Sequence, residues 1–154
     1  MNIYDSALRR LSAQPRTEFE LRKYLNDKGF MNSEIDDVIS EFLSCGYLDD
    51  AAFCADYFRY AFGKGWGRKR IVSELKKKGV DAEVIQNAFA DYEEENPVDE
   101  RTIARQEAEK ILRMADISGE EPVPEKVLGR IARRLASYGY SPEIIYGIIG
   151  ELRK

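Results

Sequence analysis

Histidine is absent from the sequence, and cysteine, proline and tryptophan are scarce: the 154 residues include two cysteines, five prolines and one tryptophan. Without histidine the chain lacks the commonest general base and every Ser-His or Cys-His nucleophile pair. Cys45 and Cys54 supply too few soft ligands for a zinc site, and two isolated cysteines are typical of small apolar side chains in a reducing compartment. We therefore expect a protein that is not an enzyme and that holds neither a metal nor a cofactor.

A net positive charge and long apolar runs are also missing. The formal net charge is −4, from 24 Lys and Arg against 28 Asp and Glu, and the isoelectric point is near 5.1. Such a chain does not coat DNA through its overall charge. The opening residues, "MNIYDSALRRLSAQ", contain no long apolar run, so we predict neither a signal peptide nor a membrane span. These absences favour a cytoplasmic protein.

The sequence contains no strand signal: no run alternates apolar with polar residues, and no hairpin turn joins two such runs. What is present is a pattern that recurs around Gly29, Gly79 and Gly139. The spacing of apolar residues on both sides of each glycine is that of apolar helix faces. We predict that each glycine ends one helix in the left-handed conformation and that a second helix follows. The recurring apolar positions are Leu25, Leu75 and Leu135 before the glycines, and Ile35, Ile85 and Ile145 after them.

Helix start signals surround these pairs of helices. Residues 17–20, Thr-Glu-Phe-Glu, fit a capping box, and Ser141 precedes a proline at the first helical position. One more helical segment precedes each pair. The start signals of the remaining helices are Ser33, Asp49 or Asp50, Asp81 and Asn96-Pro97.

Together these elements predict an all-α fold of nine helices. We divide it into three tandem three-helix repeats, residues 1–48, 49–96 and 97–154, with the last break inside a repeat at residues 118–124. A repeat of this size buries little surface alone, so we expect the three to stack into an elongated, curved array.

The segment "GKGWGRKRIVSELKKKGV" begins with a glycine loop, residues 63–67. A P-loop needs a hydroxyl residue after its Gly-Lys and a strand before it, and a dinucleotide-binding loop also needs the strand; neither is present. We expect an inter-helix loop with Trp66 packed as a wedge. Because an indole ring can keep one edge exposed, Trp66 could also contact a partner.

Basic residues dominate this segment, with seven bases and one acid from Lys64 to Lys78. Ile71, Val72 and Leu75 share one helix face, and most of the bases lie on the other. Two interpretations stay open: a solvated face with Arg70–Glu74 and Glu74–Lys78 pairs, or a site for an anionic partner such as phosphates or acidic protein patches. The candidate binding residues are Lys64, Arg68, Lys69, Arg70, Lys76 and Lys77.

Two other charged stretches bear on the interpretation. From Asp81 to Glu100 there are eight acids and no base, so the middle repeat is strongly dipolar. The acids could complement a basic face of this protein, or they could repel nucleic acid and set its orientation. A second basic patch, or merely a solvated face, is indicated by the helical spacing of Arg130, Arg133 and Arg134.

The segment "GYLDDAAFCADYF", Gly46–Phe58, followed by the basic segment Gly63–Val80, resembles the RecX family of recombination regulators. That family typically shows such a turn, an apolar helix, and a basic glycine loop leading into an "RI..EL..KG" helix. The motifs match over the middle third, and the triple repeat and the chain length match over the whole. Cys54 replaces a common alanine, and the third repeat has Tyr138-Gly139 where lysine-glycine is usual, so its surface chemistry need not be shared.

The resemblance implies a regulator that binds the RecA recombinase, usually as a filament on single-stranded DNA. It implies a protein that lies along the filament groove and restrains ATP hydrolysis, strand exchange and repressor cleavage. We expect a monomer that binds RecA through the six basic residues named above. Direct contact of these residues with DNA phosphates is also possible.

Two other functions remain as alternatives. A free-standing helical DNA-binding module is suggested by the short helices joined at a glycine, although the chain is acidic and has no recognisable base-reading cluster. An enzyme with the acidic run as metal ligands is the third hypothesis. The stretch "EEENPVDE" lacks the spacing of a calcium loop and fits a solvated helix end and linker better.

Overall fold

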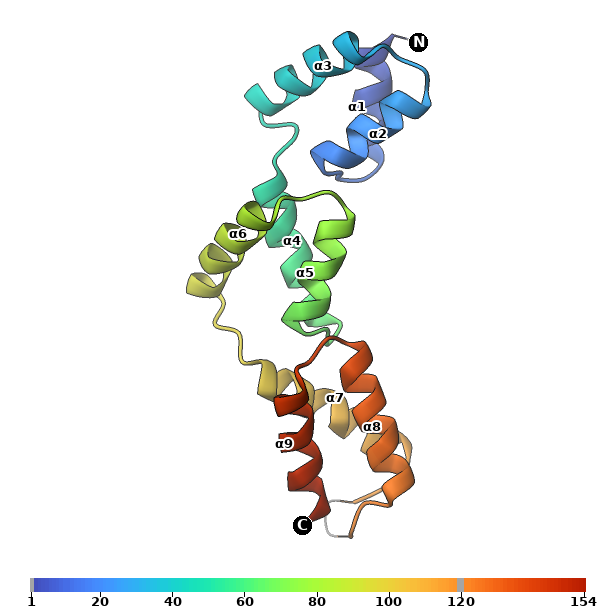
Figure 1. Ribbon diagram of the computed structural model, residues 1–154, viewed down its shortest axis with the longest axis vertical. Coiled ribbons are helices and arrows are strands. Elements are labelled where there is room, and N and C mark those ends of the chain that lie inside the picture. The colour runs from blue at the N-terminus through green and yellow to red at the C-terminus, as the bar shows by residue number, and fades with distance from the viewer. Residues whose placement is uncertain (1, 119–120) are drawn as a thin grey trace. The chain divides into compact units, whose positions relative to one another are not determined.

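The computed structural model describes residues 2–118 and 121–154, and this part of the chain is helical without any strand (Figure 1). The all-α class and the number of nine helices are confirmed for the described residues. The predicted break at residues 118–124 includes residues 119 and 120, which lie outside them. The helices are α1 Ile3–Ala13, α2 Glu18–Asp27, α3 Asn32–Ser44, α4 Asp50–Gly63, α5 Arg68–Lys77, α6 Ala82–Glu95, α7 Glu100–Met114, α8 Glu125–Ser137 and α9 Pro142–Arg153.

The chain packs into two compact units. The first unit comprises Met1–Tyr57 and Glu74–Tyr92, and the second unit comprises Phe58–Ser73 and Glu93–Lys154. Helices α4, α5 and α6 therefore contribute residues to each unit. The repeat boundaries at residues 48 and 96, and the stacking of the repeats, stay predictions. No helix in residues 2–118 and 121–154 is both long enough and apolar enough to cross a membrane.

Several helices begin where the sequence predicts. Thr17 caps α2, accepting a hydrogen bond from the amide of Glu20 at 3.1 Å, while the Glu20 carboxylate accepts from the Thr17 amide at 3.0 Å. Ser141 caps α9 and is followed by proline at the first helical position. Short-range hydrogen bonds encoded in three or four consecutive residues thus place these starts.

Two predicted helix starts are wrong. Helix α7 begins at Glu100 rather than at Asn96-Pro97, because the carboxylate of Asp99 accepts hydrogen bonds from the amides two and three residues later. Helix α3 begins one residue before Ser33 and is capped by Met31, whose amide donates to the carboxylate of Glu34 at 3.3 Å. At α3 the carboxylate hydrogen bond of Glu34 decided the start over Ser33, a residue of higher capping preference than Met31, whereas at α7 Asp99 is about as good a cap as Asn96.

The three repeated glycines adopt the predicted conformation. Gly29, Gly79 and Gly139 have φ of 91°, 85° and 89°, the left-handed region in which a side chain is strained. Each follows the last turn of a helix, and the residue after each glycine donates its amide back into that turn, at 3.3 Å, 3.1 Å and 3.1 Å. The repeat therefore encodes a helix-ending turn at all three places.

In the first unit, α1, α2 and α3 enclose a hydrophobic core. Each of these helices contacts the other two (Figure 1). Phe42 is fully buried, and the rings of Tyr4 and Tyr47 meet it edge-on with centroids 5.4 and 5.3 Å away. The buried residues of this core are Ala7, Leu21, Leu25, Ile35, Val38, Ile39, Phe42 and Leu48.

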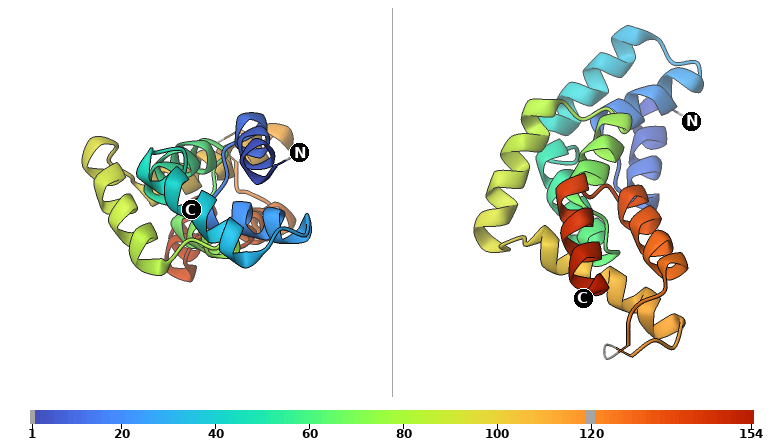
Figure 2. Two further views of the ribbon diagram at one scale, coloured as in Figure 1. Left: turned by 90° about the horizontal axis from the view of Figure 1, so that it is seen from above. Right: turned by 60° about the horizontal axis from the view of Figure 1, so that its bottom comes forward.

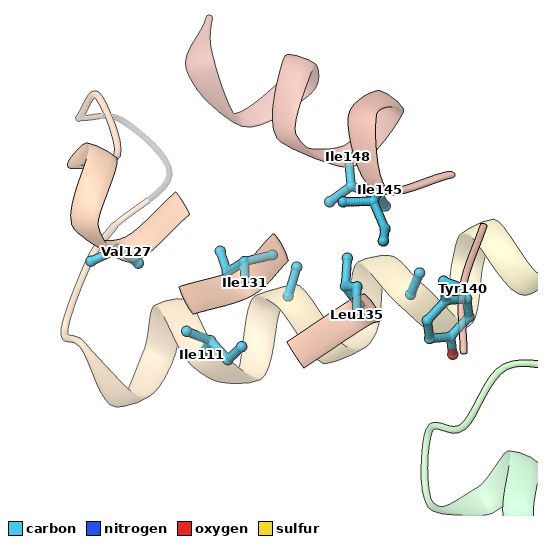
Figure 3. Close-up of a cluster of buried hydrophobic side chains, with 9 residues drawn as sticks. Ile111, Val127, Ile131, Leu135, Tyr140, Ile145 and Ile148 are labelled. Carbon is cyan, nitrogen blue, oxygen red and sulfur yellow. The ribbon is translucent and has the colours of Figure 1, made fainter. Parts of the chain in front are cut away.

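In the second unit, α7, α8 and α9 lie side by side around a second core (Figures 1 and 2). Figure 3 shows the isoleucine and leucine side chains of this core converging from the three helices, with Tyr140 at one end. Tyr140 is the polar member of the cluster, and its hydroxyl donates to the carbonyl of Gly65 at 2.6 Å. The core of the third repeat is thereby joined to the glycine loop.

Candidate binding surface

The amides of the glycine loop are all engaged within the protein. Those of Gly65 and Trp66 donate to carbonyls at the end of α4 at 3.0 and 3.1 Å, and that of Gly67 donates to the carbonyl of Tyr138 at 2.7 Å. The next amide, of Arg68, donates to the carboxylate of Glu100 at 3.2 Å. A phosphate-binding loop instead directs free amides at its ligand, so this loop does not have the geometry of a phosphate cradle.

Burial and close approach hold this loop in place. A Cβ on Gly65 would lie 1.7 Å from Oε1 of Glu107, a carboxylate only 3% exposed that forms an ion pair with Lys110 at 3.2 Å. Gly65 also has a φ of 89°, so both space and backbone conformation require glycine here. Burial, followed by the nearby Glu107 carboxylate, raises the pKa of Tyr140, which keeps this hydroxyl protonated as a donor to the loop.

Trp66 lies at the centre of a group of cations. The Lys64 ammonium is 4.7 Å from the centroid of the indole ring, and the Arg70 guanidinium is 3.9 Å from it. Lys64 also donates to the hydroxyl of Tyr60 at 3.2 Å. Cations at these distances are attracted by the electron-rich ring faces, which orients two long side chains that would otherwise be mobile. Trp66 thus serves as a platform for two of the six predicted binding residues.

Helix α8 extends this arrangement. Arg70 donates to the carbonyl of Ser137 at 3.2 Å and lies 5.7 Å from the centroid of Tyr138, which Arg134 approaches at 5.4 Å. Cation and aromatic side chains therefore alternate across the second unit. We call this group the cation–aromatic surface; it comprises Lys64, Trp66, Arg70, Tyr138 and Arg134.

The remaining predicted residues divide between the units. Arg68 and Lys69 are exposed in the first turn of α5, in the second unit, whereas Lys76 and Lys77 are exposed at its end, in the first unit. In the described part of the chain, Lys77 forms an ion pair with the carboxylate of Glu74 at 3.4 Å. The structure thus brings Lys64 and Arg70 into direct contact with one ring and assigns Lys76 and Lys77 to a different unit.

The solvated-face interpretation of the basic helix included Arg70–Glu74 and Glu74–Lys78 pairs, and neither forms in the described part of the chain. Glu74 contacts Lys77, and Lys78 instead lies 3.7 Å from the carboxylate of Glu20 on α2. Arg70 turns to Trp66 and to the carbonyl of Ser137. The long-range partners win because they hold the cations against partly buried groups, where an attraction is less screened than on the surface.

Sequence reasoning missed the contribution of Tyr138 and the position of Arg134 beside it. The available signal was the tyrosine itself, which stands where lysine is usual before the third glycine. Of the possible second patch, Arg134 joins the cation–aromatic surface, whereas Arg130 and Arg133 lie exposed on α8. The end of α8 lies beside the glycine loop because the turn at residues 138–140 packs against that loop, which the sequence alone does not show.

The acidic run was the candidate for metal ligands. Within residues 2–118 and 121–154, no group of three or more Cys, Asp or Glu side chains is arranged to hold a metal ion. One acid of the run, Asp99, has a structural role, because it accepts hydrogen bonds from the side chain and the amide of Thr102 at the start of α7. These hydrogen bonds lower the pKa of Asp99. Most of the run forms the exposed end of α6 and the segment before α7.

Comparison with known proteins gives consistent matches. Two family models match, described as the first and the second three-helix domain of RecX, over residues 4–42 and 49–88. The chain is 33% identical over 145 residues to the regulatory protein RecX of Vibrio vulnificus, covering 94% of this chain and 89% of that protein. It is 32% identical over 143 residues to the regulatory protein RecX of Mycolicibacterium smegmatis, covering 92% and 74%. The crystal structure of RecX from Lactobacillus salivarius superposes with a TM-score of 0.76 at 26% identity, covering 97% and 94% of the two chains.

Proposed function

The chain belongs to the RecX family, and on this premise we propose that it is a regulatory protein that binds the RecA recombinase assembled on single-stranded DNA. In this proposal, binding lowers ATP hydrolysis, strand exchange and coprotease activity of the filament. The protein acts by occupation and not by catalysis, as a monomer without a cofactor.

The cation–aromatic surface is the observation that carries the proposal. Lys64 and Arg70 are oriented by Trp66, and Arg134 is oriented by Tyr138, so the cations are arranged before any partner arrives. Cations that are already oriented lose less conformational entropy on binding an anion than mobile ones do. The partner is anionic: either the phosphates of the filament DNA or acidic patches of the recombinase.

Several separate contacts suit a filament, which presents the same groups repeatedly. A protein that contacts neighbouring protomers through more than one group gains affinity through effective concentration, without a large interface at any one of them. Occupying the groove through which duplex DNA enters would then restrain strand exchange, and resisting protomer motion would restrain ATP hydrolysis.

The test is single-stranded-DNA-dependent ATP hydrolysis by RecA of the same host, with this protein titrated from below to equal stoichiometry. Lys64→Gln/Arg70→Gln should raise the concentration for half-inhibition at least about tenfold, because each hydrogen bond to a charged group contributes about 1.5–3 kcal/mol and about 1.4 kcal/mol is tenfold. The control Lys126→Gln/Arg153→Gln removes the same charge from exposed positions in the same unit and should change it less than about twofold.

The outcomes separate the partner from the site. Inhibition by the wild type at concentrations where naked DNA stays unbound supports a filament-directed regulator. Equal effects of the two double variants would refute the cation–aromatic surface as the site. Tight, salt-sensitive binding to naked duplex with no effect on hydrolysis would instead favour the free-standing DNA-binding module.

A further inference from the structure

The first unit contains a pocket of about 350 Å³ that shares no residue with the cation–aromatic surface. It lies between the end of α1, the loop that follows it, one side of α2 along its length and the last residue of α5. Four of its eight lining residues are cations, each contributed by a different segment of the chain. The lining residues are Arg10, Arg16, Phe19, Glu20, Lys23, Tyr24, Asp27 and Lys77.

The carboxylates of the pocket do not neutralise these cations. Glu20 is occupied elsewhere, with Oε1 accepting from the Thr17 amide at 3.0 Å and Oε2 lying 3.7 Å from the Lys78 ammonium. Within residues 2–118 and 121–154, no carboxylate lies within 4 Å of the charged nitrogens of Arg10, Arg16 or Lys23. Lys77 is paired with Glu74 at 3.4 Å, so the cations without an internal ion pair are Arg10, Arg16 and Lys23, against the single remaining pocket carboxylate of Asp27.

The two arginines also have buried donors without acceptors. The Nε–H groups of Arg10 and Arg16 are enclosed and make no hydrogen bond within the described residues. A buried donor that has lost water and gained no acceptor costs free energy, so each such group calls for a physical explanation. An oxyanion bound between the two guanidinium groups can accept from Nε and Nη together once they turn toward it, which is the bidentate geometry that arginine offers to phosphate.

Aromatic side chains border the same pocket. The Arg10 guanidinium lies 4.6 Å from the centroid of Tyr24, which restricts the plane of the guanidinium. Phe19 is 51% exposed, and a Cβ on Gly79 would lie 2.2 Å from its Cβ and Cγ. Phe19 is thus seated against the turn at Gly79 while much of its surface stays open. An open ring beside an oxyanion site offers a stacking surface for a flat base.

We propose that this pocket binds a nucleoside phosphate, with the phosphate held by Arg10, Arg16, Lys23 and Lys77 and the base stacked on Phe19. The ligand is either a free nucleotide or a nucleotide within a single strand, since both present the same chemistry. The site is separate from the cation–aromatic surface of the second unit, and it does not depend on the proposed function.

The experiment is isothermal titration calorimetry of the full chain with deoxyadenosine 5′-monophosphate, deoxyadenosine and inorganic phosphate. We expect saturable binding of the nucleotide, weaker binding of phosphate and no binding of the nucleoside. Arg16→Gln should weaken nucleotide binding at least about tenfold, because one charge-assisted bidentate contact is lost. The control is Arg22→Gln, on the same helix as Lys23, whose guanidinium is already paired with Glu18 and Asp36.

A second variant tests the base. Phe19→Leu should weaken binding of the nucleotide several-fold and leave that of inorganic phosphate unchanged, whereas Phe19→Tyr should keep both. Thermal melting by circular dichroism identifies any variant that fails to fold. Tighter binding of a short oligonucleotide than of the mononucleotide would identify a strand as the ligand, and equal binding would identify the free nucleotide.

Three results would overturn the proposal. The first is the absence of any saturable signal with the nucleotide. The second is an equal loss of affinity in Arg16→Gln and Arg22→Gln, which would show a general charge effect. The third is equal affinity for phosphate and nucleotide with no effect of Phe19→Leu, which would remove the nucleoside from the ligand. Because the variants of the RecA assay lie at Lys64 and Arg70, failure here and failure there are distinguishable.

Discussion

Replacing Gly139 by alanine tests how the turn of the third repeat meets the start of α5. Gly139 has a φ of 89°, and its added Cβ would lie 2.4 Å from the backbone nitrogen of Arg70 and 2.9 Å from its Cα. Left-handed backbone costs an alanine about 1–2 kcal/mol, and overpacking costs about 1–3 kcal/mol more, so we expect Gly139→Ala to lower the free energy of unfolding by about 2–5 kcal/mol. The clash is with backbone, which a change of rotamer does not relieve.

The assay is urea unfolding followed by the fluorescence of Trp66. Trp66 is the single tryptophan of the chain and belongs to the second unit, as Gly139 does, so the transition reports the unit that carries the substitution. Gly150→Ala is the matched control in the same unit. Its Cβ would meet nothing within 4 Å, and its position within α9 makes alanine favourable by about 0.5–1 kcal/mol.

A third variant separates the two parts of the cost. Gly29 has a φ of 91°, and its added Cβ would meet nothing within 4 Å, so Gly29→Ala carries the left-handed cost of about 1–2 kcal/mol alone. Gly29 lies in the first unit, so the urea unfolding of Gly29→Ala is measured by far-ultraviolet circular dichroism. If Gly139→Ala destabilises no more than Gly29→Ala does, the close approach to Arg70 has no energetic weight and the reasoning is wrong.

Two other predictions concern the first unit. Thr17→Val should lower the free energy of unfolding by about 1–3 kcal/mol, measured by urea unfolding with circular dichroism, because the buried Thr17 hydroxyl donates to the carbonyl of Lys78 at 2.6 Å. Thr17→Ser keeps the hydroxyl and should cost less. Burial, and then the charge of Asp50, raises the pKa of the Cys54 thiol to about 11, so a thiol reagent at neutral pH should modify exposed Cys45 and spare Cys54. The folded thiol binds its proton more tightly than the unfolded one does, so this contribution to stability is complete below about pH 8.5 and is lost as the pH rises toward 11; an unchanged pH dependence in Cys54→Ala would contradict it.

Local features of the fold were predictable from sequence because they depend on few neighbouring residues. The turn glycines and the caps at Thr17 and Ser141 each follow from contacts within one helix end. When Ser33 and Asn96 are taken as the predicted caps, the starts of α3 and α7 were missed by two and by three residues, because Met31 and Asp99 occupy the cap positions.

The candidate site was predictable only in its composition. Trp66 and the bases around it stand out in the sequence, but their partners come from far along the chain: Ser137 and Tyr138 for Arg70, and Glu20 for Lys78. Such partners are set by packing of separate helices, which periodicity does not report. The same holds for the pocket at Arg10 and Arg16, whose fourth cation comes from the end of α5.

The same set of hydrogen bonds, which we call a joint, occurs at the start of α2 and again at the start of α5. These two joints explain how the continuous basic stretch is divided between the two units. At the start of α2, the Thr17 hydroxyl donates to the carbonyl preceding Gly79, and the next amide, of Glu18, donates to the carboxylate of Asp50 at the start of α4. At the start of α5, the Gly67 amide donates to the carbonyl preceding Gly139, and the next amide donates to a carboxylate at the start of α7.

The first joint therefore ties the start of α2 to the turn at Gly79 and to α4, and the second ties the start of α5 to the turn at Gly139 and to α7. The first joint holds the C-terminal end of α5 in the first unit, and the second joint holds its N-terminal end in the second unit. Lys77 is consequently placed beside Arg10 and Arg16, while Arg70 is placed beside Trp66 and Tyr138. The two proposed anion-binding surfaces both draw on one run of bases because the helix that carries them is shared between two joints.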